Sequence, residues 1–212
     1  MNVNEIFFSL QGESSWSGRP CAFIRLTGCD LRCTYCDSQY AYFEGTEMSV
    51  GEILREVAGY PTRLVLVTGG EPMLQESVRE LFDALIASGY SVLLETGGSV
   101  SLAGVDPRVH KIVDFKCPTS GMEGHNDYGN IQHLTHSDEL KFVVGDRHDF
   151  DWACNLIRTH DLSSRVMSVA FSPVYGKLPY AELADWVLHC GLQARLQLQL
   201  HKIIWPEIQR GV

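Results

Sequence analysis

The sequence lacks any apolar run near the roughly 18–20 residues needed to cross a bilayer, so we expect no transmembrane segment. Basic residues are few: 17 Lys and Arg stand against 26 Asp and Glu, giving a net charge of −9. Such a surface repels phosphate backbones, so we expect no nucleic-acid partner. There is also no internal repeat, no low-complexity stretch and no secretory signal. We therefore expect a cytoplasmic protein with one domain over residues 1–212, since 45% hydrophobic content suffices for one core.

The seven cysteines are an odd number, which argues against a disulfide framework. Three of them, Cys29, Cys33 and Cys36, form a C-x3-C-x2-C cluster, and no further Cys-x2-Cys or His-x3-His pair nearby completes a zinc site. Three thiolates are one fewer than a complete [4Fe–4S] site uses, which would leave one iron free for a small molecule. The spacing therefore predicts a [4Fe–4S] cluster held by these three residues. The other cysteines, which stand singly in apolar surroundings typical of buried side chains, are Cys21, Cys117, Cys154 and Cys190.

Short apolar runs alternate with amphipathic stretches after Cys21, which predicts an α/β fold with parallel strands, either doubly wound or closed partly or fully as a β/α barrel. The expected strands are Ala22–Leu26, Leu64–Thr68, Ser91–Glu95, Lys111–Phe115, Leu140–Val144, Val166–Phe171 and Arg195–Gln199. The expected helices are Val50–Val57, Gln75–Ala87, Phe150–Arg158 and Ala181–His189. The spacers after the third and fourth strands look short or irregular, and residues 116–136 read as a long loop typical of a lid.

The motifs that carry chemistry follow the expected strands, where the active sites of β/α barrels lie. In chain order they are the cysteine loop, Gly69-Gly70-Glu71-Pro72, Glu95-Thr96-Gly97-Gly98, Lys116-Cys117-Pro118 and Ser172-Pro173. In the last strand, Arg195, Gln197, Gln199 and His201 share one face, which points either to solvent or into the site. Lys141 likewise either faces the barrel interior or ends a strand.

The cysteine spacing, with Tyr35 just before the last cysteine, resembles the signature of the radical S-adenosylmethionine (SAM) superfamily. Gly69-Gly70-Glu71-Pro72 resembles the motif that holds the methionine amino group of SAM there. In that superfamily the open iron chelates SAM, and reduction splits SAM into methionine and a 5′-deoxyadenosyl radical. The resemblance implies a partial (β/α) barrel with irregular or shortened helical connections.

Within that superfamily, several segments resemble the 7-carboxy-7-deazaguanine synthase family. They are residues 6–14, 23–26, 36–38, 95–97, 114–122, 139–142 and 199–202. The resemblance implies a carbon–nitrogen lyase of queuosine and deazapurine biosynthesis, which converts 6-carboxy-5,6,7,8-tetrahydropterin into 7-carboxy-7-deazaguanine with loss of ammonia. In the family the radical takes a hydrogen from C6, the skeleton rearranges, and the hydrogen returns to regenerate SAM.

The residues suit these tasks. Arg25 could grip the substrate carboxylate with its planar fork, and Gln11 and Glu13 offer donors and acceptors for the pterin edge. The full set of expected substrate-binding residues is Leu10, Gln11, Gly12, Glu13, Arg25, Thr68, Gln199 and His201. The expected SAM-binding residues are Tyr35, Cys36, Asp37, Gly69, Gly70, Glu71, Glu95, Lys116, Cys117, Pro118 and Ser172. By resemblance Ser38 binds Mg²⁺, a flavodoxin-type protein supplies electrons, and the chain forms a homodimer.

Three alternatives stay open at this point. A glycyl-radical activating enzyme shares the cysteine spacing but acts on a protein glycine. A non-catalytic iron–sulfur electron carrier would leave the Gly-Gly-Glu-Pro motif without a purpose. A zinc-binding structural module would contain zinc without iron or sulfide.

Overall fold

The computed structural model describes residues 1–212, and its strands form one sheet in the order β3-β1-β2-β4-β5-β6-β7-β8-β9. Seven strands pair in parallel, in the order β2, β4, β5, β6, β7, β8 and β9. Strand β1 is antiparallel to both of its neighbours, β2 and β3. The strands are β1 (Asn2–Leu10), β2 (Pro20–Leu26), β3 (Thr46–Glu47), β4 (Leu64–Gly69), β5 (Ser91–Thr96), β6 (His110–Asp114), β7 (Glu139–Val144), β8 (Ser168–Pro173) and β9 (Arg195–Leu196).

The chain also forms six α-helices and five 3₁₀ helices, of which all but α6 lie between strands. The α-helices are α1 (Val50–Val57), α2 (Val78–Ala87), α3 (Arg147–Thr159), α4 (Leu162–Arg165), α5 (Tyr180–His189) and α6 (Leu200–Ile204). The 3₁₀ helices are η1 (Gln39–Tyr42), η2 (Pro72–Leu74), η3 (Pro118–Ser120), η4 (Glu123–His125) and η5 (Tyr128–His133). None of the helices combines the length and the apolar character that a membrane span needs.

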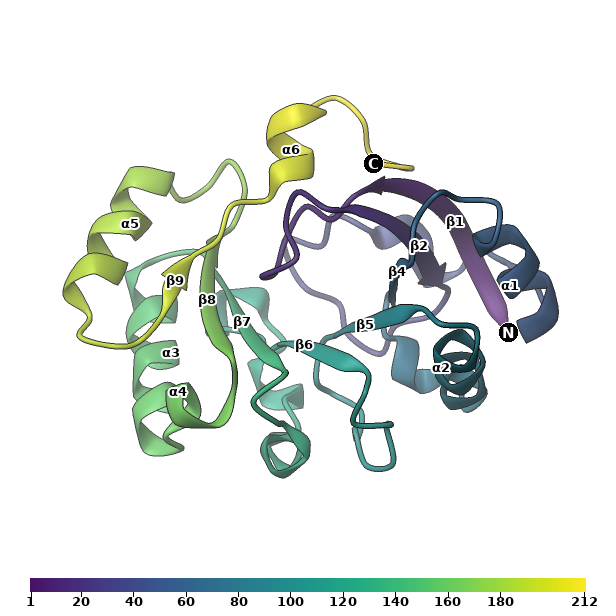
Figure 1. Ribbon diagram of the computed structural model, residues 1–212. Coiled ribbons are helices and arrows are strands. Elements are labelled where there is room, and N and C mark those ends of the chain that lie inside the picture. Colours follow the sequence, from purple (N-terminus) through teal and green to yellow (C-terminus); the bar gives the residue numbers. More distant parts are fainter.

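The sheet curves into a partial barrel, with α1 and α2 outside one part and α3 to α5 outside the other (Figure 1). The side chains of β2 alternate between the outer face of the sheet, which the helices cover, and the barrel interior. Ala22, Ile24 and Leu26 join the large core between sheet and helices, while Cys21 and Phe23 face the barrel interior. The interior core is small, formed by Phe7, Cys21, Phe23, Leu64, Leu66, Leu93 and Ile112.

The loop between β1 and β2, residues 11–19, is hydrogen-bonded across the barrel to β7 and to the segment after β9, and we call it the barrel-closing loop. It reaches into the centre of the barrel, and α6 lies above it (Figure 1). The amide of Leu200 donates to the carbonyl of Gly12 at 3.0 Å, and the amide of Ser14 donates to Gln197 Oε1 at 2.8 Å. These bonds join the start of the chain to the segment that follows β9.

The structure confirms the partial barrel and most of the expected elements, α1 residue for residue. Three expectations were incomplete or wrong. The first strand, β1, was not foreseen, and its antiparallel pairing departs from an all-parallel sheet. The expected strand Arg195–Gln199 ends at Leu196, and α6 begins at Leu200. Residues 116–136 form short 3₁₀ turns, but Lys116 alone among them lines the large cavity described below, so the expected lid is wrong.

Candidate active site

A cavity of about 840 Å³ opens where the parallel strands end. It brings together most of the residues singled out from the sequence. Those lining it are Leu10, Gln11, Gly12, Glu13, Arg25, Cys29, Cys33, Tyr35, Cys36, Asp37, Ser38, Thr68, Gly69, Gly70, Glu95, Lys116, Gln199 and His201. The expected residues that do not line it are Glu71, Cys117, Pro118 and Ser172.

The cysteine loop places three free thiols at the cavity, each partly exposed. Burial raises the pKa of the Cys29 thiol to about 11, so a cationic centre is what would keep this sulfur as a thiolate. No three His, Cys, Asp or Glu side chains converge on one metal ion, as a zinc module would require. Three thiols spread along one loop at a cavity fit a larger, multi-iron group, so the donor set matches a [4Fe–4S] cluster.

The packing around the end of β4 explains why two glycines, Gly69 and Gly70, stand there. A Cβ at Gly70 would lie 2.3 Å from the carbonyl oxygen of Gly28 and 2.5 Å from Cβ of Cys29. A Cβ at Gly69, where φ is +148°, would lie 2.2 Å from the carbonyl oxygen of Leu26. Only glycine therefore lets this turn pack directly against the start of the cysteine loop.

Glu71 turns away from the cavity and is 1% exposed. Its carboxylate accepts hydrogen bonds from the Thr96 hydroxyl and from the amides of Met73 and Gly97. Burial raises the pKa of this carboxyl despite those bonds. In this structure Glu71 thus shapes the turn after β5. Cys117 and Ser172 are also fully buried, and Pro118 opens η3.

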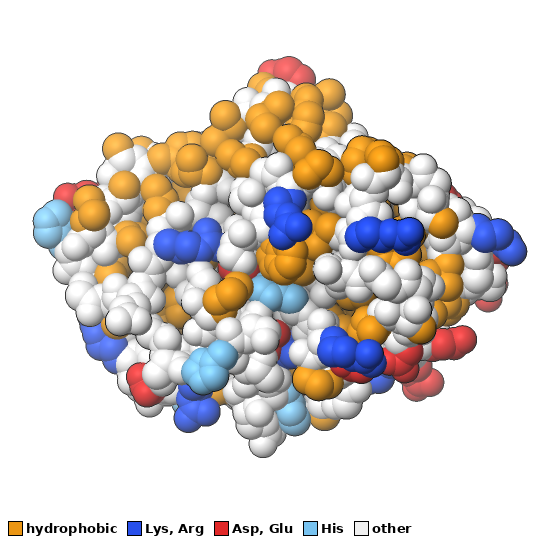
Figure 2. Space-filling view, viewed as in Figure 1, with side chains coloured by type: hydrophobic (Ala, Val, Ile, Leu, Met, Phe, Trp, Pro, Cys, Tyr) orange, Lys and Arg blue, Asp and Glu red, His pale blue; other side chains and the backbone are white.

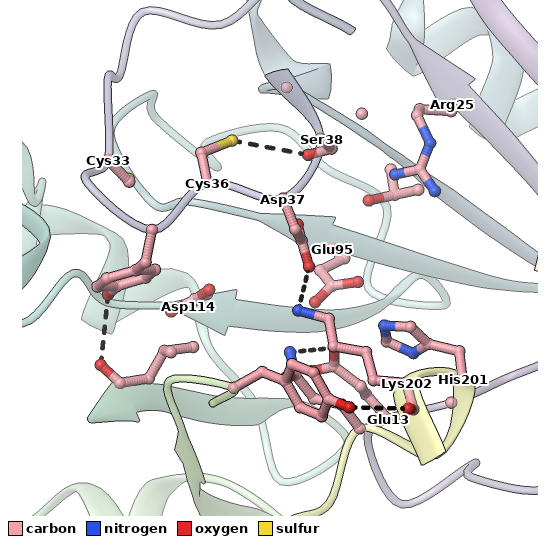
Figure 3. A pocket seen from close by; sticks show the side chains of 18 of the residues that line it. Glu13, Arg25, Cys33, Cys36, Asp37, Ser38, Glu95, Asp114, His201 and Lys202 are labelled. Atoms are coloured by element: carbon pink, nitrogen blue, oxygen red, sulfur yellow. Dashed lines mark hydrogen bonds and ion pairs between the residues drawn. The ribbon is translucent and has the colours of Figure 1, made fainter. Parts of the chain in front are cut away.

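Charged side chains meet in the middle of the cavity (Figure 3). The ammonium of Lys141 lies 2.9 Å from Glu13 Oε2, 2.5 Å from Glu95 Oε1 and 3.6 Å from Asp114 Oδ2. Asp114 also pairs with Lys116 at 2.9 Å. Although burial opposes ionisation, the surrounding carboxylates raise the pKa of Lys141, and this ammonium lowers the pKa of Glu13. Glu13 is therefore held as an anion that can accept hydrogen bonds.

Arg25 lies apart from this cluster, on the wall formed by β2 (Figure 3). Its Nε donates to Glu5 Oε1 at 2.7 Å, and neither of its two terminal nitrogens has a partner within the protein. Those nitrogens are free to grip an anion in the cavity. Three buried polar atoms at the cavity, Gln11 Nε2, Asp114 Oδ1 and Gln199 Oε1, also lack partners. Such atoms are what a ligand with its own donors and acceptors would satisfy.

The polar face of the last segment points inward, which settles the alternative left open by the sequence. Gln197 and Gln199 are 3% and 7% exposed, and both donate to the carboxylate of Glu13. His201 packs so closely on Gly12 that a Cβ there would lie 2.4 Å from its Nδ1. The barrel-closing loop and the end of the chain thus form one wall of the cavity.

Next to the cysteine loop, Asp37 Oδ2 accepts from Lys202 Nζ at 2.5 Å (Figure 3). Burial by itself would raise the pKa of Asp37, but the contact with Lys202 lowers this pKa below its usual value. Sequence reasoning missed Lys202, Asp114 and Tyr175 as cavity residues, and left Lys141 undecided. The sequence did contain a signal that Lys141 faces the cavity, since it is a charged residue within the otherwise apolar stretch Leu140–Val144. Lys202 and Asp114 lie in segments that resemble the family, whereas Tyr175 carried no signal.

Comparisons with known proteins agree with this geometry. The model of the radical SAM superfamily matches residues 23–186. A 7-carboxy-7-deazaguanine synthase from Koribacter versatilis is 47% identical over 100% of both chains. One from Chlorobaculum tepidum is 45% identical, over 100% of this chain and 97% of the relative.

Solved structures support the fold. QueE from Escherichia coli superimposes with a TM-score of 0.78 at 24% identity, covering 94% of each chain. Streptococcus suis SuiB bound to S-adenosylmethionine gives a TM-score of 0.56 at 12% identity, over 88% of this chain and 54% of that one. The superfamily match and the full-length relatives show that this chain belongs to the radical SAM superfamily and, within it, to the 7-carboxy-7-deazaguanine synthase family.

Proposed function

We propose that this protein converts 6-carboxy-5,6,7,8-tetrahydropterin into 7-carboxy-7-deazaguanine with loss of ammonia. The observation that carries the proposal is that one cavity holds two chemically different sets of residues. The cysteine loop and Gly69-Gly70 form one set, and Arg25 on β2 and the Gln11–Glu13 segment form the other. Full-length relatives named for this reaction support it.

The set that includes Arg25 suits the pterin. The two free nitrogens of Arg25 would bind its carboxylate, and the anion of Glu13 would accept hydrogen bonds from its amino and amide edge. The unpartnered Gln11 Nε2 and Gln199 Oε1 add one donor and one acceptor. Leu10, Gly12, Thr68 and His201 complete the proposed substrate-binding set.

Membership of the superfamily implies a [4Fe–4S] cluster and SAM. Cys29, Cys33 and Cys36 would hold the cluster, which with SAM supplies the radical that begins the reaction. The residues proposed to bind SAM at the cavity are Tyr35, Cys36, Asp37, Gly69, Gly70, Glu95 and Lys116. Cys117, Pro118, Ser172 and Glu71 would act from behind the cavity wall. The Ser38 hydroxyl is the proposed protein ligand of Mg²⁺, since magnesium prefers oxygen.

The proposal extends to partners. A flavodoxin-type protein would supply electrons, in a cytoplasm that keeps cluster thiols reduced. A second copy of the chain would complete a homodimer; hydrophobic side chains that gather over α6, Ile203 and Ile204 among them, support this (Figure 2). The continuous sheet from β3 to β9 supports a single domain over residues 1–212. Nothing in the fold favours a glycyl-radical activating enzyme, an electron carrier or a zinc module instead.

The test is an anaerobic assay of the cluster-reconstituted protein with reductant, SAM, Mg²⁺ and 6-carboxytetrahydropterin, read by mass spectrometry. We expect 7-carboxy-7-deazaguanine to appear. If 5′-deoxyadenosine formed without that product, the substrate assignment would be wrong. Failure of an intact, reduced cluster to cleave SAM would overturn the enzymatic function.

A further inference from the structure

Glu139 is a buried carboxylate that the proposed function does not use. It is 1% exposed, faces the barrel interior from β7 and does not line the cavity. Its Oε1 accepts from the Ser15 amide at 3.0 Å, from the Ser15 hydroxyl at 2.6 Å and from His110 Nε2 at 2.9 Å. Its Oε2 accepts from Arg195 Nη2 at 2.9 Å. Three elements and the barrel-closing loop therefore meet at one carboxylate.

The same arginine links this carboxylate to the cavity. Arg195 Nη2 also donates to Gln197 Oε1 at 2.7 Å, and that oxygen accepts from the Ser14 amide at 2.8 Å. Gln197 Nε2 in turn donates to Glu13 Oε2 at 3.1 Å. An unbroken series of hydrogen bonds thus runs from Glu139 through Arg195 and Gln197 to Glu13.

The barrel-closing loop needs such ties. Ser14 adopts a φ of +62°, a left-handed conformation that costs a non-glycine residue free energy and persists only when its surroundings impose it. Ser15 is exposed, so burial alone does not hold it in place. The Ser14 amide is bonded to Gln197, and the hydroxyl of the next residue, Ser15, is bonded to Glu139, so both bonds hold the strained position.

We propose that the buried Glu139 and the partly exposed Arg195 form an anchor that positions Gln11, Gly12 and Glu13 for the pterin. Neither residue touches the cavity, so each acts through the barrel-closing loop as a positioning residue. Burial by itself would raise the pKa of Glu139, but hydrogen bonds from His110, Ser15 and Arg195 lower this pKa to about 2. The carboxylate of Glu139 is therefore ionised at neutral pH. The part of the inference that concerns the pterin rests on the proposed function.

The anchor predicts an effect on one ligand only. Loosening residues 11–19 disturbs the wall with Glu13, whereas the cysteine loop and Gly69-Gly70 are built by other elements. We expect weaker pterin binding with unchanged affinity for SAM and unchanged iron content. A residue needed only for folding would affect both ligands together.

The test compares Glu139→Gln with Glu182→Gln, a control at an exposed position of α5. Hydrogen exchange should show the amides of residues 11–19 exchanging roughly ten- to hundredfold faster in Glu139→Gln, with β4 and β5 unchanged. The KM for the pterin should rise by about tenfold, while the Kd for SAM stays within about twofold. Unchanged exchange in the loop, or an equal loss of affinity for both ligands, would overturn the proposal.

Two milder variants keep the test decisive if Glu139→Gln fails to fold. Ser15→Ala removes only the hydrogen bond from the Ser15 hydroxyl to Glu139. Arg195→Lys removes the guanidinium that bonds both Glu139 and Gln197 but keeps the positive charge. Both should loosen residues 11–19 in the same measurement, and wild-type exchange in both would contradict the anchor. Hydrogen exchange needs no substrate, so it decides on the anchor even if the wild-type protein makes no 7-carboxy-7-deazaguanine.

Discussion

Arg25 uses one nitrogen for the fold and leaves two for a ligand. Its Nε is bound to Glu5, so Arg25→Lys keeps a positive charge but loses the planar fork. A charge-assisted hydrogen bond contributes about 1.5–3 kcal/mol, so we expect the KM for 6-carboxytetrahydropterin to rise roughly 10- to 100-fold. The Kd for SAM should not change. Tetrahydropterin without the carboxylate is the control ligand, and if the substitution weakened its binding equally, Arg25 would not be the carboxylate site.

Gly70 illustrates how one missing side chain shapes the site. In Gly70→Ala the new Cβ would lie 2.3 Å from a backbone oxygen, which cannot move as a side chain can. We expect strain of about 1–3 kcal/mol, a displaced cysteine loop and less iron and sulfide per chain after reconstitution. Gly51→Ala, in α1 with open space around the new Cβ, is the matched control. Full iron content in Gly70→Ala would show that the loop tolerates the shift.

At the scale of elements, α6 is a short helix held by few contacts. It has no fully buried residue, and its main polar tie to the cysteine loop is the pair Lys202–Asp37. This pair is partly exposed, so its contribution is small, and Lys202→Met should speed amide exchange in residues 200–204 by only about two- to fivefold. Lys177→Met, at an exposed position elsewhere, should leave that exchange unchanged. Equal effects of the two substitutions would mean that the ion pair does not hold α6.

At the scale of the whole molecule, Glu139 makes stability depend on pH. Its pKa falls from 4.5 to about 2 on folding, so it stabilises the fold by about 3 kcal/mol above pH 4.5. A lowered folded pKa means that this contribution is lost as the pH falls from about 4.5 toward about 2. Urea unfolding at about pH 7 and about pH 3.5 should show the gap between wild type and Glu139→Gln narrowing in acid. A gap of the same size at both pH values would contradict the ionised anchor.

The local sequence by itself determined much of this protein. Cysteine spacing identified the cluster loop, and Gly69-Gly70 and the polar face of residues 195–201 pointed to the cavity. The periodicity of apolar residues located α1 and most of the parallel strands, because the pattern of an amphipathic helix or a buried strand is contained within about ten residues. The family resemblance added the expected reaction, since its motifs are short and contiguous.

Other features were decided only by the tertiary structure. The contacts of Glu13 with Lys141 and of Ser15 with Glu139 join residues 128 and 124 positions apart. The position of Glu71 behind the cavity wall likewise depends on Thr96, a neighbour supplied by the next strand. No local pattern encodes such pairings, because a side chain's partner is set by how the sheet curves and where the barrel-closing loop returns to it. The sequence therefore determined which chemical groups are present, and the fold decided which of them face a ligand and which hold the others in place.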